Sequence, residues 1–587
     1  MSIKEIASYL RTLRYLRASQ WGWRAYYILE RNLRSDTWGP SPGIKSAEVA
    51  IAEAREFPSV PLFRPTAPAD TNETAMMERG EFHHLNQTMI LGRDRPDWKL
   101  GNQTLNRLWI NNLHSHYWAY DLAKEVIAGE EQSNRASELF LHYLSDWMER
   151  CELEVPGAKH LAWNSFVVAT RLSWWIRSWL EFKAAAISFP PEFETRLLHS
   201  MRRQASYLER HIEWDLRGNH LFRDAVGLAW AGRFFCDEQA EQWMRTATKI
   251  AVSQAKEQVL EDGGHFERSP MYHIQIMEDV LSLALLLTDK AAAEKMRATW
   301  ERMAEFLAWM RHPDGAIPLF NDAALHASCE PNLMLSFGKQ LGVYAKPELR
   351  RGGRLFAQTG IAVWHDDRWS MFFDVGAGGP DYQPGHTHAD TLAFEGSFRG
   401  RRLFVDAGVY SYDNNDERKY DRSTRSHNTV CVDGQDSSEV WHIFRVGRRA
   451  QPLEVSATFT AGHMRALASH NGYDHLPGRP RHGRAITISG EGLFSITDTV
   501  EGRGEHEVSG GLLIEPGWKA SPAPGGWELC ADSDRVRVRM DGPGPMKLFE
   551  EKRKYHPEFG RELDSARLSW SVKGPLPLQV QTIISQA

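Results

Sequence analysis

The amino-acid sequence predicts an α+β protein of more than one domain, in which helical hairpins precede an antiparallel β-sandwich. Three observations support this fold class. The chain has 587 residues, which is too long for one hydrophobic core and indicates two or three domains. Apolar residues recur at three- and four-residue spacing over 100–345, which is typical of amphipathic helices. Beyond Gly352 the pattern changes to short runs rich in β-branched and aromatic residues, separated by Gly, Asp, Asn and Pro.

The helical half is predicted to contain consecutive helices joined by short polar breaks, which implies hairpins of helices. The predicted helices span 163–187, 191–211, 219–235, 238–260, 272–287 and 291–311. A polar segment between 341 and 355 then separates the two architectures. We therefore predict an N-terminal helical extension over 1–99, a helical domain over 100–345 and a sandwich domain over 355–587.

The sandwich half is predicted from runs of strand length with turn residues between them. The predicted strands include 360–365, 370–375, 403–410, 429–432, 453–460, 494–500, 536–540 and 578–584. Many short strands with regular breaks are typical of antiparallel sandwiches.

Composition excludes several classes of protein. The chain is 42% hydrophobic and 25% charged, with a mean hydropathy of -0.48, as expected of a globular protein in water. Basic residues number 70 and acidic residues 76, so no overall field favours nucleic acid and none is expected as a partner. The five cysteines are odd in number and contain no CxxC pair, which argues against a disulfide framework and against a thiolate zinc site.

The N-terminal segment determines the expected location. Its first 36 residues contain no apolar run of signal-peptide length, so a cytoplasmic location is expected for the chain as written. No apolar run approaches the ~20 residues of a membrane span. The segment is basic and carries Ile6, Leu10 and Leu13 at helical spacing, so peripheral membrane association is possible. A first helix packed on the protein is the preferred interpretation.

A polar cluster in the sandwich half carries the strongest chemical signal. If 386–390 is extended, the two-residue period places His386, His388 and Asp390 on one face. Imidazoles with a carboxylate are a zinc-type ligand set. Candidate ligands drawn from separate strands are His388, Asp406 and His427; histidines in hydrogen-bonded loops are the commoner alternative.

The helical half offers weaker signals. Asn219 and His220 open a predicted helix, where Asn219 would ordinarily act as an N-cap. Tyr272 begins another helix after a polar loop over 262–271, and packing is the ordinary role of such a residue. The segment 312–322 is interpreted as a turn, which turn chemistry explains adequately.

Taken together and in this order, these pieces resemble the heparinase II/III-like family of polysaccharide lyases. The matching segments are 108–114, 163–175, 218–220, 269–273, 386–390, 406–410 and 420–430. The resemblance covers about 100–450 and implies an incomplete α/α toroid followed by the sandwich. It also implies an active site in the groove between these halves, and it makes a bacterial origin the expected one.

The resemblance further implies roles for individual residues. By this resemblance, Asn219 and His220 bind the substrate carboxylate, and Tyr272 and His386 transfer protons. Tyr420 assists them. One structural zinc ion is bound by His388, Asp406 and His427. Further candidates for contact with the sugar are Arg223, Glu267 and Trp163. Arg223 lies one turn after Asn219, and it could equally pair with Asp224 or Glu213.

The implied reaction is that of a carbon–oxygen lyase on an anionic, uronic-acid-containing polysaccharide or oligosaccharide. The C5 hydrogen of a uronate becomes removable when its carboxylate is neutralised or hydrogen-bonded as an enolate forms. Amide and imidazole donors suit that task. Two alternatives stay open: C5 epimerisation of a uronate in a polymer, and non-catalytic glycan binding or assembly in bacterial cell-surface polysaccharide synthesis. The sandwich half is no more basic than the whole chain, so dense sulfation of the substrate is not indicated.

Overall fold

A computed structural model describes residues 3–33, 51, 57–61, 73–100, 107–127, 133–153, 155–343 and 348–587. The chain forms two compact units. The sandwich unit contains Met1–Leu16, Val259–Gln275 and Glu301–Ala587, and the helical unit contains Arg17–Gln258 and Ile276–Trp300. The predicted domain boundary at 345 lies in 344–347, outside the described residues, and the predicted domain ranges stay a prediction.

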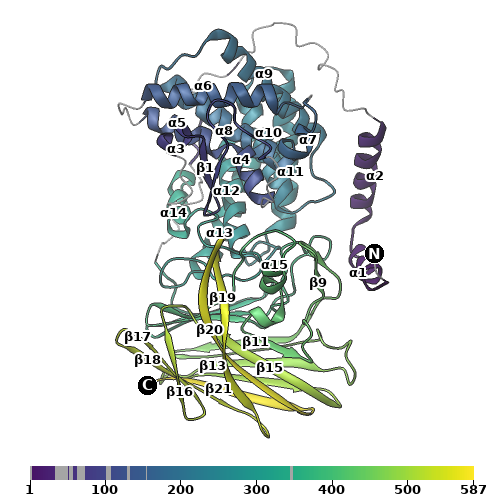
Figure 1. Ribbon diagram of the computed structural model, residues 1–587, viewed down its shortest axis with the longest axis vertical. Coiled ribbons are helices and arrows are strands. Elements are labelled where there is room, and N and C mark those ends of the chain that lie inside the picture. Colours follow the sequence, from purple (N-terminus) through teal and green to yellow (C-terminus); the bar gives the residue numbers. More distant parts are fainter. Residues whose placement is uncertain are drawn as a thin grey trace. The chain divides into compact units, whose positions relative to one another are not determined.

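The helical unit consists mainly of helices (Figure 1). Its helices are α2 (Ala18–Leu33), α3 (Thr74–Glu78), α4 (Arg107–Ser115), α5 (Tyr117–Ile127), α6 (Ser133–Arg150), α7 (Ala158–Ala162), α8 (Ser165–Ala184), α9 (Pro191–Arg210), α10 (Asn219–Phe234) and α11 (Glu238–Gln258), with parts of α12 (Pro270–Leu286) and α13 (Lys290–Trp309). The six helices predicted between 163 and 311 are confirmed, each end within three residues.

Tryptophan burial holds these helices together. Four tryptophans of this unit are at most 6% exposed: Trp163, Trp174, Trp175 and Trp230. Helix α8 is buried along most of its length and packs against α5, α9 and α10. Gly227 permits the close approach of α10 to α8, because an added Cβ would lie 2.7 Å from the Ala169 Cα. Close packing of aromatic and small residues therefore accounts for the stability of the hairpins.

The sandwich unit is built from antiparallel sheets. Sheet order is β11-β12-β13-β14-β21-β18-β17-β16 in the largest, β19-β20-β15-β8 in the second and β3-β4-β5-β6-β7 in the third. The strands are β3 (Gly352–Phe356), β4 (Ile361–His365), β5 (Trp369–Asp374), β6 (Phe394–Phe398), β7 (Arg401–Phe404), β8 (Val430–Val432), β11 (Pro452–Thr460), β12 (His463–His470), β13 (Arg481–Ile488), β14 (Phe494–Glu501), β15 (Glu505–Leu513), β16 (Lys519–Ala523), β17 (Gly526–Ala531), β18 (Asp534–Asp541), β19 (Lys547–Glu558), β20 (Arg561–Pro575) and β21 (Leu578–Gln586). Shorter elements of this unit are α14 (Pro331–Ser336), α15 (Asp416–Asp421), β9 (Val440–Trp441) and β10 (Arg445–Val446).

Strands β4 and β5 are buried at every position because both of their faces are covered. Ala362 and Trp364 point into the main sandwich core. Ile361 and Val363, which alternate with them, join a second core with Phe306 of α13. A strand buried on both faces loses the polar alternation of a surface strand. This explains the continuous apolar runs in the sequence.

Two predicted extended segments are wrong. Residues 386–390 form a loop rather than a strand, so their side chains do not follow a two-residue period. The strand predicted over 403–410 ends at Phe404, and Gly408 has a φ of 73° with the His556 carbonyl too close for any Cβ. Beyond Phe404 the chain instead bonds to other strands, through Val405 to Leu513 and through Val409 to His556.

The N-terminal 99 residues contain a β-hairpin in addition to helices. Strands β1 (Glu81–His84) and β2 (Gln87–Ile90) pair in an antiparallel register. The two turn residues, Leu85 and Asn86, both have positive φ values of 53° and 58°, as in a type I′ turn. Leucine is an unusual residue for such a turn, so the hairpin is hard to predict from the sequence.

Helix α1 (Ile3–Leu13) packs on the sandwich unit, in agreement with the preferred interpretation of the N-terminal segment. Its contacts are made with the hairpin of β9 and β10, through residues such as Glu439 and Trp441. Among the helices that the structure describes, none is long and apolar enough to cross a membrane.

Candidate active site

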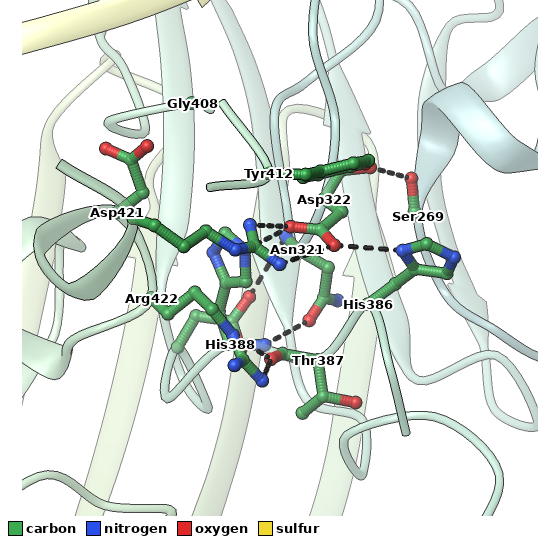
Figure 2. Close-up of polar contacts among 12 residues, drawn as sticks. Ser269, Asn321, Asp322, His386, Thr387, His388, Gly408, Tyr412, Asp421 and Arg422 are labelled. Atoms are coloured by element: carbon green, nitrogen blue, oxygen red, sulfur yellow. Dashed lines mark hydrogen bonds and ion pairs between the residues drawn. The ribbon is translucent and has the colours of Figure 1, made fainter. Parts of the chain in front are cut away.

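The centre of the candidate site is the carboxylate of Asp322, which is fully buried in the sandwich unit (Figure 2). His386 donates from Nδ1 to Oδ2 over 2.9 Å, and His388 donates from Nε2 to Oδ1 over 2.8 Å. Arg418 of α15 makes a two-pronged ion pair with the same carboxylate, with 2.9 Å between Nη2 and Oδ2. One carboxylate therefore fixes two imidazoles and a guanidinium.

The backbone around Asp322 is held in an uncommon conformation. Asn321 has a φ of 57°, which is rare outside glycine. The Asn321 side-chain oxygen accepts from the backbone N–H of His388 at 3.0 Å. The backbone N–H of Asn321 donates to the Asp390 carboxylate at 3.2 Å. Ser269 donates to the Asp322 carbonyl at 2.6 Å, next to the start of α12. Several loops distant in sequence are thus tied to one short turn.

The charge of Asp322 is stabilised in spite of its burial. Burial by itself opposes ionisation, but Arg418 and the hydrogen bonds from His386 and His388 hold the pKa of Asp322 well below its usual range. An ionised carboxylate can only accept hydrogen bonds, so each histidine must place a proton on the nitrogen that faces Asp322. In a neutral imidazole that donates from Nδ1, as His386 does toward Asp322, Nε2 is the acceptor.

Tyr272 lies directly against His386. The two rings are stacked, with their centroids 3.8 Å apart and an interplanar angle of 29°. The Tyr272 hydroxyl lies 3.2 Å from the hydroxyl of Tyr412. Burial, supported by the Asp322 charge, raises the pKa of Tyr272 above its usual value, so its resting form is the protonated phenol.

Two basic residues close to Tyr272 in the sequence bond to backbone carbonyls. Arg268 donates to the carbonyls of Ala377 and Gln358, and His273 bonds to the Met303 carbonyl. Arg418 instead lies over the Tyr412 ring, 4.9 Å from its centroid. The positive charge beside Tyr272 and Tyr412 is therefore that of Arg418, which lies on α15.

Glu267 is a second buried carboxylate beside His386. Its Oε2 lies 3.7 Å from His386 Nε2, and its side chain is 1% exposed. The sequence identified Glu267 as a candidate for sugar contact. In the structure it faces the nitrogen of His386 that would take or release a proton.

The predicted zinc ligands are His388, Asp406 and His427, and the two histidines lie close together in the sandwich unit. Their ring centroids are 5.3 Å apart, and both rings are buried. His427 Nδ1 donates to Asp406 Oδ2 over 2.7 Å. The outer nitrogens, His388 Nδ1 and His427 Nε2, are buried and have no hydrogen-bond partner. Burial, in spite of the bond to Asp322, lowers the pKa of His388 to about 3, so this imidazole is neutral.

Tyr420 has surroundings of a different kind. Its hydroxyl donates to the Lys554 carbonyl at 3.3 Å, and its ring meets His556 edge-on at 6.2 Å. Burial raises the pKa of Tyr420 to about 12. Its predicted assisting role stays a prediction that the contacts of this residue do not support.

The predicted carboxylate-binding residues belong to the helical unit. Asn219 is the first residue of α10 and the N-cap is Gly218, so the N-cap interpretation of Asn219 is wrong. His220 bonds from Nδ1 to Glu213 Oε2 at 2.9 Å. Arg223 pairs with neither of its expected partners but with Asp279 of α12, at 3.0 Å. The roles implied for Asn219, His220 and Arg223 stay predictions.

Trp163 belongs to the core of the helical unit. It is 1% exposed, and its indole donates to the Cys151 carbonyl at 2.8 Å. Its ring meets Tyr207 edge-on. A buried indole of this kind offers no face to a sugar, so the predicted substrate contact is not carried into the proposal below.

Sequence reasoning missed Asp322, Tyr412 and Arg418. Asp322 was interpreted as part of a turn, and its partners lie 64 to 96 residues further along the chain. Nothing in the local sequence indicates such a pairing. The burial of Arg418, which requires a carboxylate partner, becomes visible only in the structure.

The chain matches two family models over nearly its whole length. Residues 54–346 match the model described as Heparinase II/III N-terminus, and residues 348–583 match the model described as Heparinase II/III-like, C-terminal. The chain therefore belongs to the heparinase II/III-like family, as the sequence motifs predicted.

Curated relatives and solved structures agree with this family. A heparin-sulfate lyase of Bacteroides thetaiotaomicron is 24% identical over 70% of this chain, and one of Bacteroides stercoris is 27% identical over 70%. The chain spans 62% and 65% of the length of these relatives. A crystal structure of heparinase III matches with a TM-score of 0.73 at 19% identity, over 96% of this chain and 89% of that one. The predicted fold class, helical toroid and antiparallel sandwich, is confirmed by this likeness.

Proposed function

We propose that the protein is a polysaccharide lyase that cleaves a uronic-acid-containing polysaccharide by β-elimination. The observation that carries the proposal is the stacked pair of Tyr272 and His386, with His386 oriented by the buried Asp322. The names of the bacterial relatives support an anionic polysaccharide as the substrate class. Following the family resemblance, Asn219 and His220 are proposed to bind the uronate carboxylate.

The two proton transfers of the reaction are assigned from the resting states of the side chains. His386 donates a hydrogen bond from Nδ1 to Asp322. Its Nε2 is then the acceptor nitrogen, which is the form that a base needs. We assign removal of the C5 proton to this nitrogen. Tyr272 begins as a phenol, so it can deliver its proton to the C4 oxygen as the glycosidic bond breaks. Before the next cycle, His386 releases the proton taken from C5 to solvent and the Tyr272 phenolate takes one up from solvent, while the C4=C5 double bond stays in the product.

A product screen tests the function. Purified protein incubated with uronate-containing polysaccharides is expected to form an unsaturated product that absorbs in the ultraviolet. Exchange of the C5 hydrogen with solvent without such absorbance would indicate the epimerase. Polysaccharide binding with neither exchange nor product would indicate the binding protein. Among candidate substrates, heparan sulfate tests the class that the names of the relatives suggest.

We further propose that His388, Asp406 and His427 hold one zinc ion of structural character. The unpartnered, buried nitrogens of His388 and His427 are of the type that zinc binds. In the described part of the chain, no three donors already stand in a metal-binding arrangement. A bound ion would satisfy the two nitrogens and order the loops that carry His386 and Asp406.

His388→Ala tests this metal site. We expect the variant to lose bound zinc and to melt at a lower temperature, because metal affinity in a buried site is also folding free energy. Metal analysis and thermal unfolding are measured for both proteins, with and without a chelator. His365→Ala is the control, since His365 is a buried histidine of the same unit that bonds to Ser370 and to the Trp309 carbonyl. A chelator that leaves the melting temperature of the parent unchanged would contradict the proposal.

A further inference from the structure

An exposed aromatic residue lies at the edge of the candidate site. Phe444 is at the tip of the hairpin formed by β9 and β10, and 41% of it is exposed. Its ring meets Tyr412 edge-on at 5.1 Å and His386 edge-on at 6.1 Å. The reacting histidine therefore has a solvent-exposed phenyl ring as its neighbour.

The hairpin tip is held in place by two buried arginines. Arg418 donates from Nη2 to the Ile443 carbonyl at 2.9 Å, while it also pairs with Asp322. Arg422 donates from Nη1 to the carbonyls of His442 and Ile443 at 2.9 and 3.0 Å. His442 has a φ of 52°, an uncommon conformation that these bonds stabilise. The tip is thus fixed relative to the carboxylate that orients His386.

The base of the hairpin is fixed by helix α1. Glu439, which precedes β9, accepts from Arg11 Nε at 2.7 Å and from the Ser8 hydroxyl at 2.6 Å. Trp441 donates from its indole to the Thr12 hydroxyl at 3.1 Å. These bonds therefore join helix α1 to the hairpin of β9 and β10.

We propose that Phe444 is a sugar-stacking residue of the substrate site, held by the hairpin as a rigid arm. This inference rests on the proposed function and extends it to a particular contact. The Phe444 ring is partly exposed beside the reacting groups, so part of it is open to a bound sugar. Pyranose rings present C–H faces that pack on aromatic rings, and a phenyl group that is already fixed loses little entropy on binding. The occupant is the sugar ring next to the uronate on which His386 acts.

Phe444→Ala and Phe444→Trp test the contact. For the alanine variant we expect KM to rise about tenfold, the size of a contact of about 1.4 kcal/mol, with kcat changed less than about threefold. The tryptophan variant keeps an aromatic face and is expected to stay within about threefold of the parent in KM. The matched control is Phe549→Ala on β19, since Phe549 is 39% exposed and lies in the same unit. Phe549→Ala should leave both KM and kcat unchanged.

The hairpin's part is tested by a double-mutant cycle. Glu439→Ala removes the acceptor for Arg11 and Ser8, and it is expected to raise KM about threefold in the parent through looser placement of Phe444. In the Phe444→Ala background the same change should have no effect on KM. An equal effect in both backgrounds would contradict the rigid-arm role.

The outcomes separate this inference from the proposed function. If the parent makes unsaturated product and Phe444→Ala has the parent's KM, the inference is overturned while the lyase stands. If the parent makes no product, the lyase proposal fails, and binding of the same polysaccharides to parent and variant is compared by affinity electrophoresis. Weaker binding by Phe444→Ala would then support the sugar contact, and equal or undetectable binding would overturn it.

Discussion

Tyr272→Phe should lower turnover by at least ~10²-fold while the protein folds normally, because one acid–base group contributes about 10²–10⁴-fold. The substitution keeps the ring that stacks on His386 and removes only the hydroxyl. What is lost is the proton that we assign to the C4 oxygen. Thermal unfolding and kcat are measured together, on a polysaccharide that the parent cleaves.

The control for this substitution is Tyr473→Phe. Tyr473 is also fully buried in the sandwich unit, where its hydroxyl donates to the Val430 carbonyl at 2.7 Å. Its loss should cost about 1 kcal/mol in stability, as for a typical hydrogen bond, with kcat retained. Full turnover in a well-folded Tyr272→Phe protein would remove Tyr272 from the mechanism.

Asp322→Asn should be the most damaging single change at the site, because it affects both folding and catalysis. The side chain of Arg418 is 1% exposed, and an amide leaves its charge uncompensated. Breaking a buried ion pair in this way costs about 3–5 kcal/mol in the free energy of unfolding. The amide can also donate toward His386 Nδ1, which favours the tautomer whose Nε2 carries the proton. We therefore expect kcat to fall by more than ~10²-fold in the protein that still folds.

Asp498→Asn separates these two effects. Asp498 on β14 binds Arg484 with two bonds of 2.7 and 3.0 Å and accepts from His482 at 2.7 Å, so it resembles Asp322 in burial and in partners. A comparable loss of thermal stability is expected from this change, with normal kcat per folded molecule. Equal kcat values for the two variants would show that Asp322 stabilises the unit without orienting His386.

Much of the fold could be predicted from the sequence because its signals are local. Each helix between 163 and 311 is marked by a 3.6-residue apolar period and by polar breaks, and these fix its ends closely. Seven strands of the sandwich, β4, β5, β8, β11, β14, β18 and β21, match runs that were named from their β-rich composition, whereas others such as β12, β13 and β20 were not named. The segment 386–390 was predicted wrongly, because its conformation is set by bonds to Asn321 and Asp322 rather than by its own pattern.

The candidate site was predictable only in part, for a related reason. His386 and Tyr272 were found through a resemblance of motifs, and the structure stacks them together. Asp322 and Arg418 are 96 residues apart, and each is unremarkable in its local sequence. Pairing at such a distance is decided by the tertiary fold, since each buried charge requires its partner. A single sequence does not show which buried carboxylate pairs with which buried guanidinium.

The contact between helix α1 and Glu439 has a consequence for the order in which the chain is made. Arg11 and Glu439 are separated by 428 residues, so the helix leaves the ribosome long before its partner exists. At about 5–20 residues per second, the interval is roughly 20–90 s. During that time Ser8, Arg11 and Thr12 of α1 lack their partners on the hairpin side. The attachment of α1 to the hairpin is therefore a late event of synthesis, and the N-terminal helix is among the last elements to be secured.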